Sequence, residues 1–343
     1  MSKTKIAING FGRIGRQAFK LALDNHDLEV VGINDLTSPE ALAGLLKYDS
    51  NYGRYGKEVS FDEKHIIVDG KKFTVLAEKD PSALPWKDLD VDIVIESTGR
   101  FTSSEKAGAH LQAGAKRVII SAPAKDEGMT KTFVLGVNED KYSDEAIISN
   151  ASCTTNCIAP VAHVLHTKFG IQKAMMTTIH SYTAEQNLVD GPPPGGHSND
   201  MRRARAAATN IVPTTTGAAI SATETIPALK GLFDGMAIRV PTPVGSLSDF
   251  TMLLARDVKV EEVNQAFTDA ANHPMYKDRI TVTNDQIVSS DIVGNSSSAI
   301  VDLSLTKVVG GNMVKVIAWY DNEFGYSNRL IEQCVLVGKT LKK

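Results

Sequence analysis

The sequence has few cysteines, no long apolar run and little excess charge. Three cysteines in 343 residues are too few for a disulfide framework, which favours a reducing, cytoplasmic setting. No apolar run approaches the roughly 18 residues of a membrane span, and Met1–Gly10 lacks the apolar centre of a signal peptide. The 37 basic and 40 acidic residues leave a formal charge of -3, so we expect no general basic surface for nucleic acid or anionic membranes.

The length and the apolar content indicate a globular protein of two domains. A chain of 343 residues exceeds the roughly 250–300 residues at which a single core stops growing. Apolar residues make up 42% of the chain and charged residues 22%, which argues against extended disorder.

The first third of the chain alternates strand and helix patterns. Apolar runs at Lys5–Asn9, Leu28–Ile33, Val91–Glu96 and Arg117–Ser121 alternate with helical patterns. A capping box at Thr102–Glu105 predicts one of these helices. Such alternation is typical of an α/β Rossmann domain, a doubly wound and mostly parallel sheet.

After about residue 150 the pattern changes to longer β-rich segments. Only a few helical stretches interrupt them, which predicts an α+β domain on a mostly antiparallel sheet. These predicted strands are Ile171–Ile179, Met236–Val240, Asp249–Ala255, Ala299–Leu305 and Val314–Tyr320.

A glycine-rich turn follows the first predicted strand. Residues Gly10–Gly15 have the pattern G-x-G-x-x-G and open a predicted helix, whose N-terminus favours a pyrophosphate. Asp35 lies 20 residues beyond Gly15 (35 − 15), at the end of the next predicted strand, where a carboxylate can accept hydrogen bonds from ribose. The alternative is an ordinary turn with structural glycines. The context favours a dinucleotide site, and the carboxylate favours NAD over NADP because it repels a 2′-phosphate.

The segment Ser149–Cys157 joins a predicted strand to a predicted helix. Cys153 lies at the start of this helix, where the dipole and free N–H groups favour the thiolate. Cys157 and Cys334 are predicted to be buried core residues. We expect no metal site, because the cysteines lack further ligands at suitable spacing.

A reactive thiol usually needs a base beside it, and His180 is the best candidate among eight histidines. It ends a long predicted strand and begins a polar turn, whereas a structural histidine remains the alternative. Groups suited to phosphate also follow position 150, although each of them, taken alone, is better explained by salt bridges of the arginines or an ordinary loop of threonines. They are Arg202–Arg205, Thr214–Gly217 and Arg239.

Together these stretches resemble phosphorylating glyceraldehyde-3-phosphate dehydrogenases. The resemblance covers nearly the whole chain, and its most specific motifs are SNASCTTN and WYDNEFGY. The matching stretches are Ala7–Gly15, Glu96–Thr102, Val118–Lys125, Ser149–Asn156, His180–Thr183, Arg202–Ala206, Arg239–Pro243 and Trp319–Tyr326.

The resemblance implies a role for each matching residue. Cys153 would be the nucleophile, and His180 would activate it and transfer protons. The NAD site would comprise Gly10, Gly12, Arg13, Ile14, Asp35, Lys79, Ser121 and Asn322. The subsite for inorganic phosphate would comprise Ser152, Thr154, Thr216 and Gly217, and that for the substrate phosphate Thr183, Arg239 and the nearby Arg203.

The resemblance also implies a domain plan and an assembly. Residues 1–151 with 321–343 would form the NAD-binding Rossmann domain, and 152–320 the catalytic and oligomerisation domain of a homotetramer. The substrates would be glyceraldehyde 3-phosphate and inorganic phosphate. Lys79 stands where many relatives carry arginine, and the loop Leu188–Met201 is longer and richer in proline than usual.

Other functions compete with this interpretation. Erythrose-4-phosphate dehydrogenase shares the fold, the thiol and the cofactor. Aspartate-semialdehyde dehydrogenase is more distant, since the motifs WYDNEFGY and HSYT count against it. A competing function of another class is an additional role as a surface-displayed or nucleic-acid-associated binding protein. The sequence has no export signal or basic patch that indicates this role.

Overall fold

The computed structural model describes residues 3–126, 128–193 and 200–341, so positions 194–199 of the predicted long loop lie outside it. The chain divides into two compact units. The first comprises Met1–Phe133, Asp140–Ser152 and Ser327–Lys343, and the second comprises Val134–Glu139 and Cys153–Tyr326. Within the described residues, no helix combines the length and apolar character that a membrane span requires.

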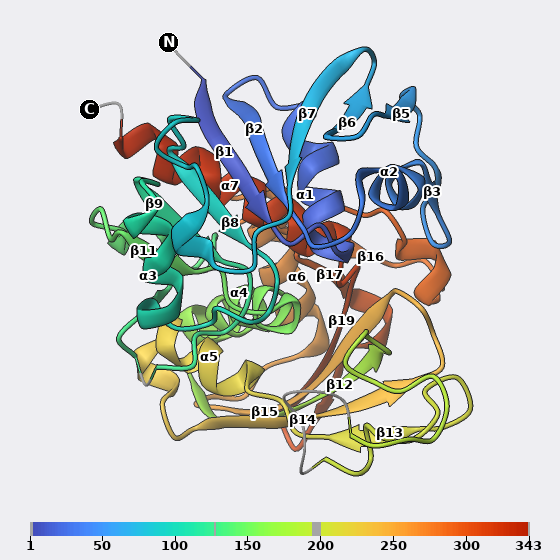
Figure 1. The fold of residues 1–343 in the computed structure, drawn as a ribbon. Coiled ribbons are helices and arrows are strands. Elements are labelled where there is room, and N and C mark those ends of the chain that lie inside the picture. The colour runs from blue at the N-terminus through green and yellow to red at the C-terminus, as the bar shows by residue number, and fades with distance from the viewer. Residues whose placement is uncertain (1–2, 127, 194–199, 342–343) are drawn as a thin grey trace. The chain divides into compact units, whose positions relative to one another are not determined.

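The first unit is a doubly wound sheet (Figure 1). Its strands pair in parallel from β10 to β7, and an antiparallel edge follows. In spatial order they are β10 (Lys131–Thr132), β11 (Ile147–Ser149), β9 (Arg117–Ile120), β8 (Ile93–Glu96), β1 (Thr4–Asn9), β2 (Leu28–Asn34), β7 (Lys71–Leu76), β6 (His65–Val68) and β5 (Val59–Phe61). The predicted Rossmann architecture is confirmed.

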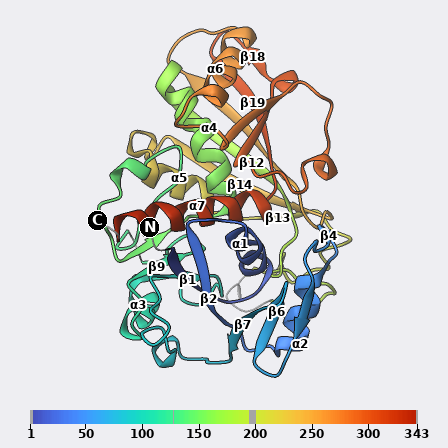
Figure 2. The ribbon, with the colours of Figure 1, turned by 90° about the horizontal axis from the view of Figure 1, so that it is seen from above.

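Helices cover both faces of this sheet because successive strand residues point to opposite sides. Ile6 and Ile8 of β1 pack in one core with the helices α1 (Arg13–Leu23), α2 (Pro39–Lys47) and α7 (Phe324–Thr340). Ala7 lies between them in sequence and packs in a second core with α3 (Ser104–Gln112). Figure 2 shows α1 and α3 on opposite sides of β1 and β2.

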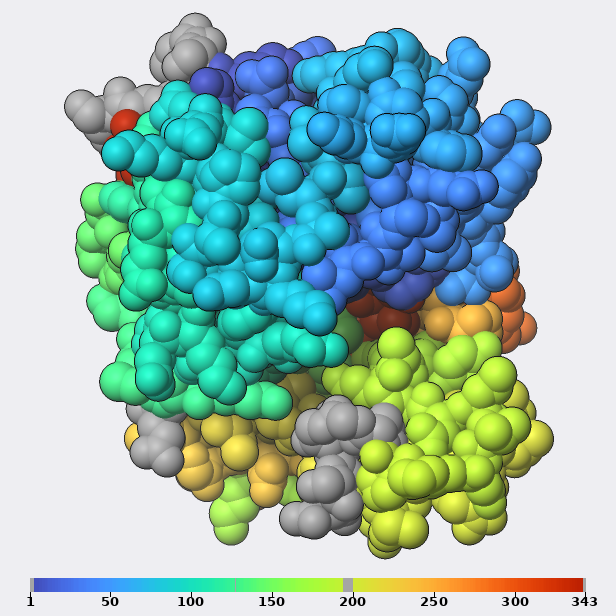
Figure 3. Space-filling view, in the orientation of Figure 1, coloured from blue at the N-terminus to red at the C-terminus, as the bar shows by residue number. Residues whose placement is uncertain are grey.

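The edge formed by β5, β6 and β7 lies at the surface (Figure 3). Its side chains Phe61, Lys71 and Lys72 are exposed. A short antiparallel pair, β3 (Tyr48–Asp49) and β4 (Gly53–Arg54), precedes it in the sequence.

The second unit is built on a mostly antiparallel sheet, as predicted. Its parallel pairs are β12 with β14 and β16 with β17. In spatial order the strands are β13 (Val212–Thr214), β14 (Phe233–Val240), β12 (Ile171–Ser181), β15 (Ser246–Leu254), β19 (Met313–Tyr320), β17 (Ala299–Asp302) and β16 (Ile280–Thr283), with β18 (Lys307–Val309) beside β19. The helices are α4 (Cys153–Phe169), α5 (Ala218–Thr225) and α6 (Val260–Asn272).

Two local expectations need correction or extension. The capping box was expected at Thr102–Glu105, but Ser103 is the N-cap of α3, and its hydroxyl accepts the N–H of Lys106. The N–H of Ser104 is bound by the Asp126 carboxylate at 2.7 Å, a partner that is distant in sequence. The contacts group residues 134–139 and 321–326 with the second unit, and the domain plan, which places both segments in the NAD-binding domain, stays a prediction.

Candidate active site

In the glycine-rich turn of the first unit, Gly10 and Gly15 lie against backbone atoms, whereas Gly12 faces open space. Gly10 has a φ of +95°, and a Cβ there would lie 2.8 Å from the backbone of Ser97. A Cβ on Gly15 would collide with the Gly10 carbonyl oxygen. A Cβ on Gly12, in contrast, would meet nothing within 4 Å. Gly12 is the N-cap of α1 and supplies no side-chain cap, so the first N–H groups of this helix are available to an anion.

A cavity of about 650 Å³ opens beside this turn, at the carboxyl ends of β1, β2 and β8. Its lining includes the predicted cofactor residues Gly10, Gly12, Asp35 and Lys79. Backbone N–H groups fix the Asp35 carboxylate, with Phe11 donating to Oδ2 at 2.8 Å and Thr37 to Oδ1 at 3.0 Å. The open helix terminus and the fixed carboxylate fit the pyrophosphate and ribose of a dinucleotide.

Other predicted cofactor residues lie outside the lining of this cavity. The Arg13 guanidinium bonds to Asp49 at 2.7 Å and lies over the Tyr52 ring. The Ser121 hydroxyl is buried without a hydrogen-bond partner among the described residues, and the Ser121 N–H donates to Glu96. A buried hydroxyl of this kind suits a polar ligand. The contacts of Arg13, Ile14 and Ser121 with NAD stay predictions.

A strained turn leads from the first unit into the nucleophile helix. Ala151 has a φ of +57°, in the left-handed region that is uncommon for residues other than glycine. The Ser149 hydroxyl accepts the Ala151 N–H at 3.0 Å and donates to the Ala122 carbonyl at 2.7 Å. These bonds hold the turn, and after Ser152 the helix α4 begins at Cys153, which places this thiol at the positive end of a helix.

In the second unit, Cys153 and His180 lie together. The Cys153 Sγ is 3.5 Å from His180 Nε2. The other ring nitrogen, Nδ1, lies 2.6 Å from the Ser181 carbonyl oxygen. Because a carbonyl only accepts, Nδ1 carries the proton of the neutral ring, and the Nε2 lone pair faces the thiol. This is the orientation of a general base.

Arg239 sets the electrostatics of this pair. It is the register partner of His180 across β12 and β14. Its Nη1 lies 3.0 Å from His180 Nδ1, but both nitrogens carry protons in the tautomer set by the shorter 2.6 Å contact to Ser181, so they share the Ser181 carbonyl and make no hydrogen bond to each other. Arg239 Nη1 donates to the Ser181 carbonyl at 3.1 Å and to the Thr183 hydroxyl at 3.3 Å. The structure thus brings together the predicted residues Cys153, His180, Thr183 and Arg239.

Opposing effects act on the thiolate expected at Cys153. Desolvation raises the pKa of this half-buried thiol, whereas the Arg239 charge and the bonds at Thr154 lower it. Desolvation, followed by the Arg239 charge, lowers the pKa of His180 to about 3, so the imidazole is neutral and can take up the thiol proton as the sulfur attacks. The thiolate stays a prediction. The predicted burial of Cys157 and Cys334 is confirmed.

The other predicted phosphate residues of the second unit, and the predicted cofactor residue Asn322, are held by protein contacts, and the Arg203 charge acts on both His180 and Arg239. Arg203 donates through Nη1 to Glu185 at 2.5 Å and through Nε to Thr214 at 3.1 Å, and it pairs with Asp200 at 3.0 Å. The Thr216 hydroxyl accepts the Ala218 N–H at the start of α5, whose N-cap is Gly217. Asn322 Oδ1 accepts the N–H of Gly245 and the hydroxyl of Ser246. Their ligand contacts stay predictions.

Sequence reasoning missed Tyr320. Its buried hydroxyl bonds to Thr154 at 2.9 Å and to Thr178 at 2.8 Å, and its ring lies edge-on to His180 at 6.0 Å. Tyr320 thereby connects the start of the nucleophile helix to the strand that carries the base. The signal available was its place at the end of an apolar strand, inside the WYDNEFGY motif.

Comparisons with known proteins agree with this geometry. The family model "Glyceraldehyde 3-phosphate dehydrogenase, NAD binding domain" matches residues 4–104, and the model of the C-terminal domain matches residues 152–322. The chain is 53% identical over 330 residues to glyceraldehyde-3-phosphate dehydrogenase of Geobacillus stearothermophilus, covering 96% of each chain. It is 52% identical over 340 residues to that of Streptomyces coelicolor, covering 98% of this chain and 99% of the relative. The chain belongs to the glyceraldehyde-3-phosphate dehydrogenase family of NAD-dependent oxidoreductases.

Proposed function

We propose that the chain oxidises D-glyceraldehyde 3-phosphate, with NAD⁺ and inorganic phosphate, to 1,3-bisphosphoglycerate through a thioester on Cys153. The observation that supports this most is the 3.5 Å contact between Cys153 Sγ and His180 Nε2, with Nδ1 held by a carbonyl. A nucleophile and its oriented base are the parts that acyl transfer through a covalent intermediate requires.

The first step forms a carbon–sulfur bond. As Sγ attacks the aldehyde carbon, Nε2 of His180 takes the thiol proton and passes it to the aldehyde oxygen, which becomes the hydroxyl of a hemithioacetal and leaves His180 neutral for the next step. The N–H groups at the start of α4 stabilise negative charge on that oxygen in the transition state. Arg239 and Thr183, whose donor and hydroxyl lie 3.3 Å apart, hold the substrate phosphate, with Arg203 nearby.

The second step is oxidation, and the third is transfer to phosphate. NAD⁺, when bound, accepts the hydride from the hemithioacetal carbon. His180 takes the hydroxyl proton, which leaves a thioester. Inorganic phosphate, held by Ser152, Thr154, Thr216 and Gly217, attacks the thioester carbonyl, and the sulfur leaves as the thiol after protonation. The thioester keeps the free energy that hydrolysis would dissipate.

For the cofactor we propose that Asp35 binds the ribose hydroxyls and that Gly10, Gly12, Arg13 and Ile14 surround the pyrophosphate at the start of α1. Lys79 would lie beside the adenosine, and Ser121 and Asn322 would bind the nicotinamide half. The fixed Asp35 carboxylate supports NAD over NADP, because it opposes an added phosphate.

We further propose that the chain works as a homotetramer in the cytoplasm. Large apolar side chains are strongly exposed on the isolated chain around the long loop, among them Leu188 at 77%, Val189 at 73% and Ile211 at 71%. Exposed apolar side chains of this size favour burial against further subunits. A catalytic thiol supports the reducing compartment, and Cys153, Cys157 and Cys334 are all free. Light scattering at micromolar concentration tests the assembly.

The deciding experiment measures NADH formation from glyceraldehyde 3-phosphate with phosphate, with arsenate, and with neither. We expect strong dependence on one of the two anions, a lower kcat/KM with erythrose 4-phosphate, and loss of turnover in Cys153→Ser. Turnover that is equal without either anion would contradict the thioester phosphorolysis. Unchanged turnover in Cys153→Ser would remove this thiol from the mechanism.

A further inference from the structure

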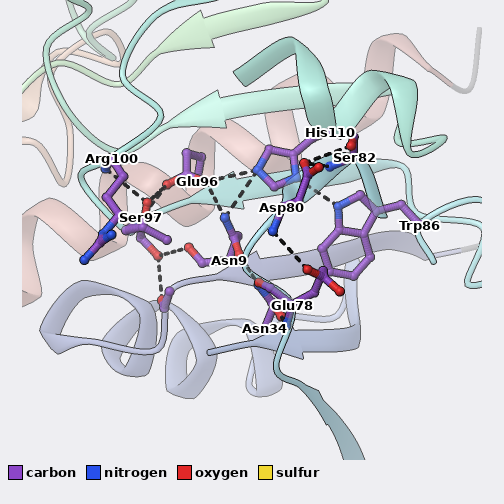
Figure 4. A network of polar contacts seen from close by, with 12 residues as sticks. Asn9, Asn34, Glu78, Asp80, Ser82, Trp86, Glu96, Ser97, Arg100 and His110 are labelled. Carbon is purple, nitrogen blue, oxygen red and sulfur yellow. Dashed lines mark hydrogen bonds and ion pairs between the residues drawn. The ribbon is translucent and has the colours of Figure 1, made fainter. Parts of the chain in front are cut away.

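A connected set of polar side chains is buried at the carboxyl ends of the central parallel strands (Figure 4). Asn9, Asn34 and Glu96 are the last residues of β1, β2 and β8, His110 lies on α3, and Trp86 lies in the second core. All five are 5% exposed or less. Polar groups at such depth cost stability unless each is satisfied, so their bonding pattern carries information.

The chemistry of Trp86 fixes the direction of the bonds around His110. The indole Nε1 can only donate, and it lies 3.0 Å from His110 Nδ1, which therefore accepts. The proton of the neutral ring is then on Nε2, which donates to Glu96 Oε2 at 3.0 Å. One tautomer of His110 thus follows from the fold.

Asn9 and Asn34 extend this order across the sheet. Asn9 Nδ2 donates to the same Glu96 oxygen at 2.5 Å, which leaves Asn9 Oδ1 to accept from Asn34 Nδ2 at 2.7 Å. Asn34 also exchanges two bonds with the backbone of Glu78, each at 2.9 Å. The two side-chain amides of this network therefore have a single orientation each: the Glu96 carboxylate fixes that of Asn9, and the Glu78 backbone fixes that of Asn34.

The far ends of this network form walls of the 650 Å³ cavity. The second Glu96 oxygen accepts the N–H of Thr98 at 2.9 Å and also its hydroxyl. Asn9, Asn34, Glu78 and Thr98 all line the cavity. Neither His110 nor Trp86 lines it, so these two residues act on the cavity only through the side chains that they hold.

We infer that His110 is a positioning residue for dinucleotide binding: through Glu96 and Asn9 it holds the walls of the cavity and the strand end from which the glycine-rich turn departs. The inference rests on the cavity being the NAD pocket proposed above. His110 touches no reacting group. Its loss therefore weakens dinucleotide binding and raises the KM for NAD⁺, and it leaves kcat at saturating NAD⁺ unchanged.

The test compares His110→Leu with His110→Gln. Leucine makes none of these bonds, whereas the Gln amide reaches the position of Nε2 and can donate to Glu96. Calorimetry with NAD⁺ and with ADP-ribose gives the dissociation constants, and thermal melting gives stability. In His110→Leu we expect the Kd for both ligands to rise about tenfold, which corresponds to the loss of one buried hydrogen bond. In His110→Gln we expect the Kd to return part of the way to the wild-type value.

Two further variants test whether the effect of His110→Leu comes from the hydrogen-bond network. Trp86→Phe removes the donor that fixes the tautomer and keeps an aromatic ring in the core, so it remains informative if His110→Leu does not fold. We expect a several-fold higher Kd, with the loss of buried indole volume read separately from thermal melting. His163→Leu is the matched control. His163 lies in the second unit, on α4, and bonds to the Tyr276 hydroxyl at 2.8 Å. Its loss should leave both dissociation constants within about twofold.

Three outcomes would overturn the inference. They are unchanged dissociation constants in both Trp86→Phe and His110→Leu, an equal loss of affinity in His110→Leu and His110→Gln, and a kcat that falls while the KM for NAD⁺ stays constant.

Asp35→Asn separates the two proposals. If NAD⁺ binding is weaker in Asp35→Asn but intact in the His110 and Trp86 variants, only this inference fails. If Asp35→Asn binds normally, the pocket assignment fails with it.

Discussion

Lowering the pH from about 7 to about 5 should destabilise the protein through His180. This imidazole is neutral in the folded protein, where burial and Arg239 lower its pKa from the ordinary 6.5 to about 3. The unfolded chain binds a proton at this position between these two values. Because the unfolded state then binds more protons than the folded state, the free energy of unfolding falls as the pH falls through this window.

The size of the effect follows from the two pKa values. At about pH 5, roughly 1.5 units below the ordinary value of 6.5, the loss is about 2 kcal/mol. Carboxylates such as Asp126 and Glu145, whose pKa values are lowered to about 2, also lose stabilisation on acidification. Those contributions are common to wild type and His180→Gln, so the difference between the two proteins isolates His180.

Urea-induced unfolding of both proteins, at pH 7 and pH 5 and at one fixed protein concentration, measures this difference. We expect the wild type to lose about 2 kcal/mol more than His180→Gln between the two pH values. The overall stability of the variant does not enter, since only the change with pH is compared. Equal losses in the two proteins would refute the reasoning, because they would mean that His180 remains free to take up a proton in the folded protein.

Two further predictions address the cofactor preference and the active-site hydroxyls. Asp35→Asn removes the charge that opposes a 2′-phosphate, so the ratio of kcat/KM with NADP⁺ to that with NAD⁺ should rise on the order of tenfold, and an unchanged ratio would assign the preference elsewhere. Tyr320→Phe deprives the hydroxyls of Thr154 and Thr178 of a buried partner and should lower the free energy of unfolding by about 1–2 kcal/mol. Tyr48→Phe, at an exposed position, should change it by less than about 0.5 kcal/mol in the same denaturation assay.

Local patterns predicted much of the fold because they report directly on backbone geometry. The strand ending at Asn9 and the turn from Gly10 were found from an apolar run followed by glycines, and β1 begins one residue before the predicted Lys5 and ends at Asn9 as predicted. The N-cap lies one residue beyond the predicted one, at Ser103, and Asp126, far along the chain, accepts the N–H of the first helical residue, Ser104. Tertiary partners of this kind leave no trace in a local pattern.

The candidate site was predicted less completely because its energetics depend on burial. Cys153 and His180 were found from their places at a helix start and a strand end, yet neither pattern indicated that desolvation raises the pKa of the thiol against the effect of the helix start. The carboxylates of Glu185 and Asp200 at Arg203 were likewise not foreseen. Nor did any local pattern indicate that His110 and Glu96 meet, since they lie on a helix and a strand that only the folded sheet brings together.

The pairing of β12 with β14 places His180 directly opposite Arg239. In a pleated sheet, inserting or deleting a single residue within either strand moves every later side chain to the other face. The imidazole and the guanidinium would then point in opposite directions, although both residues would still be present in the gene. Variants of this protein should therefore tolerate changes in length between strands far more readily than within 171–181 or 233–240, where a single codon gained or lost separates the base from its cation.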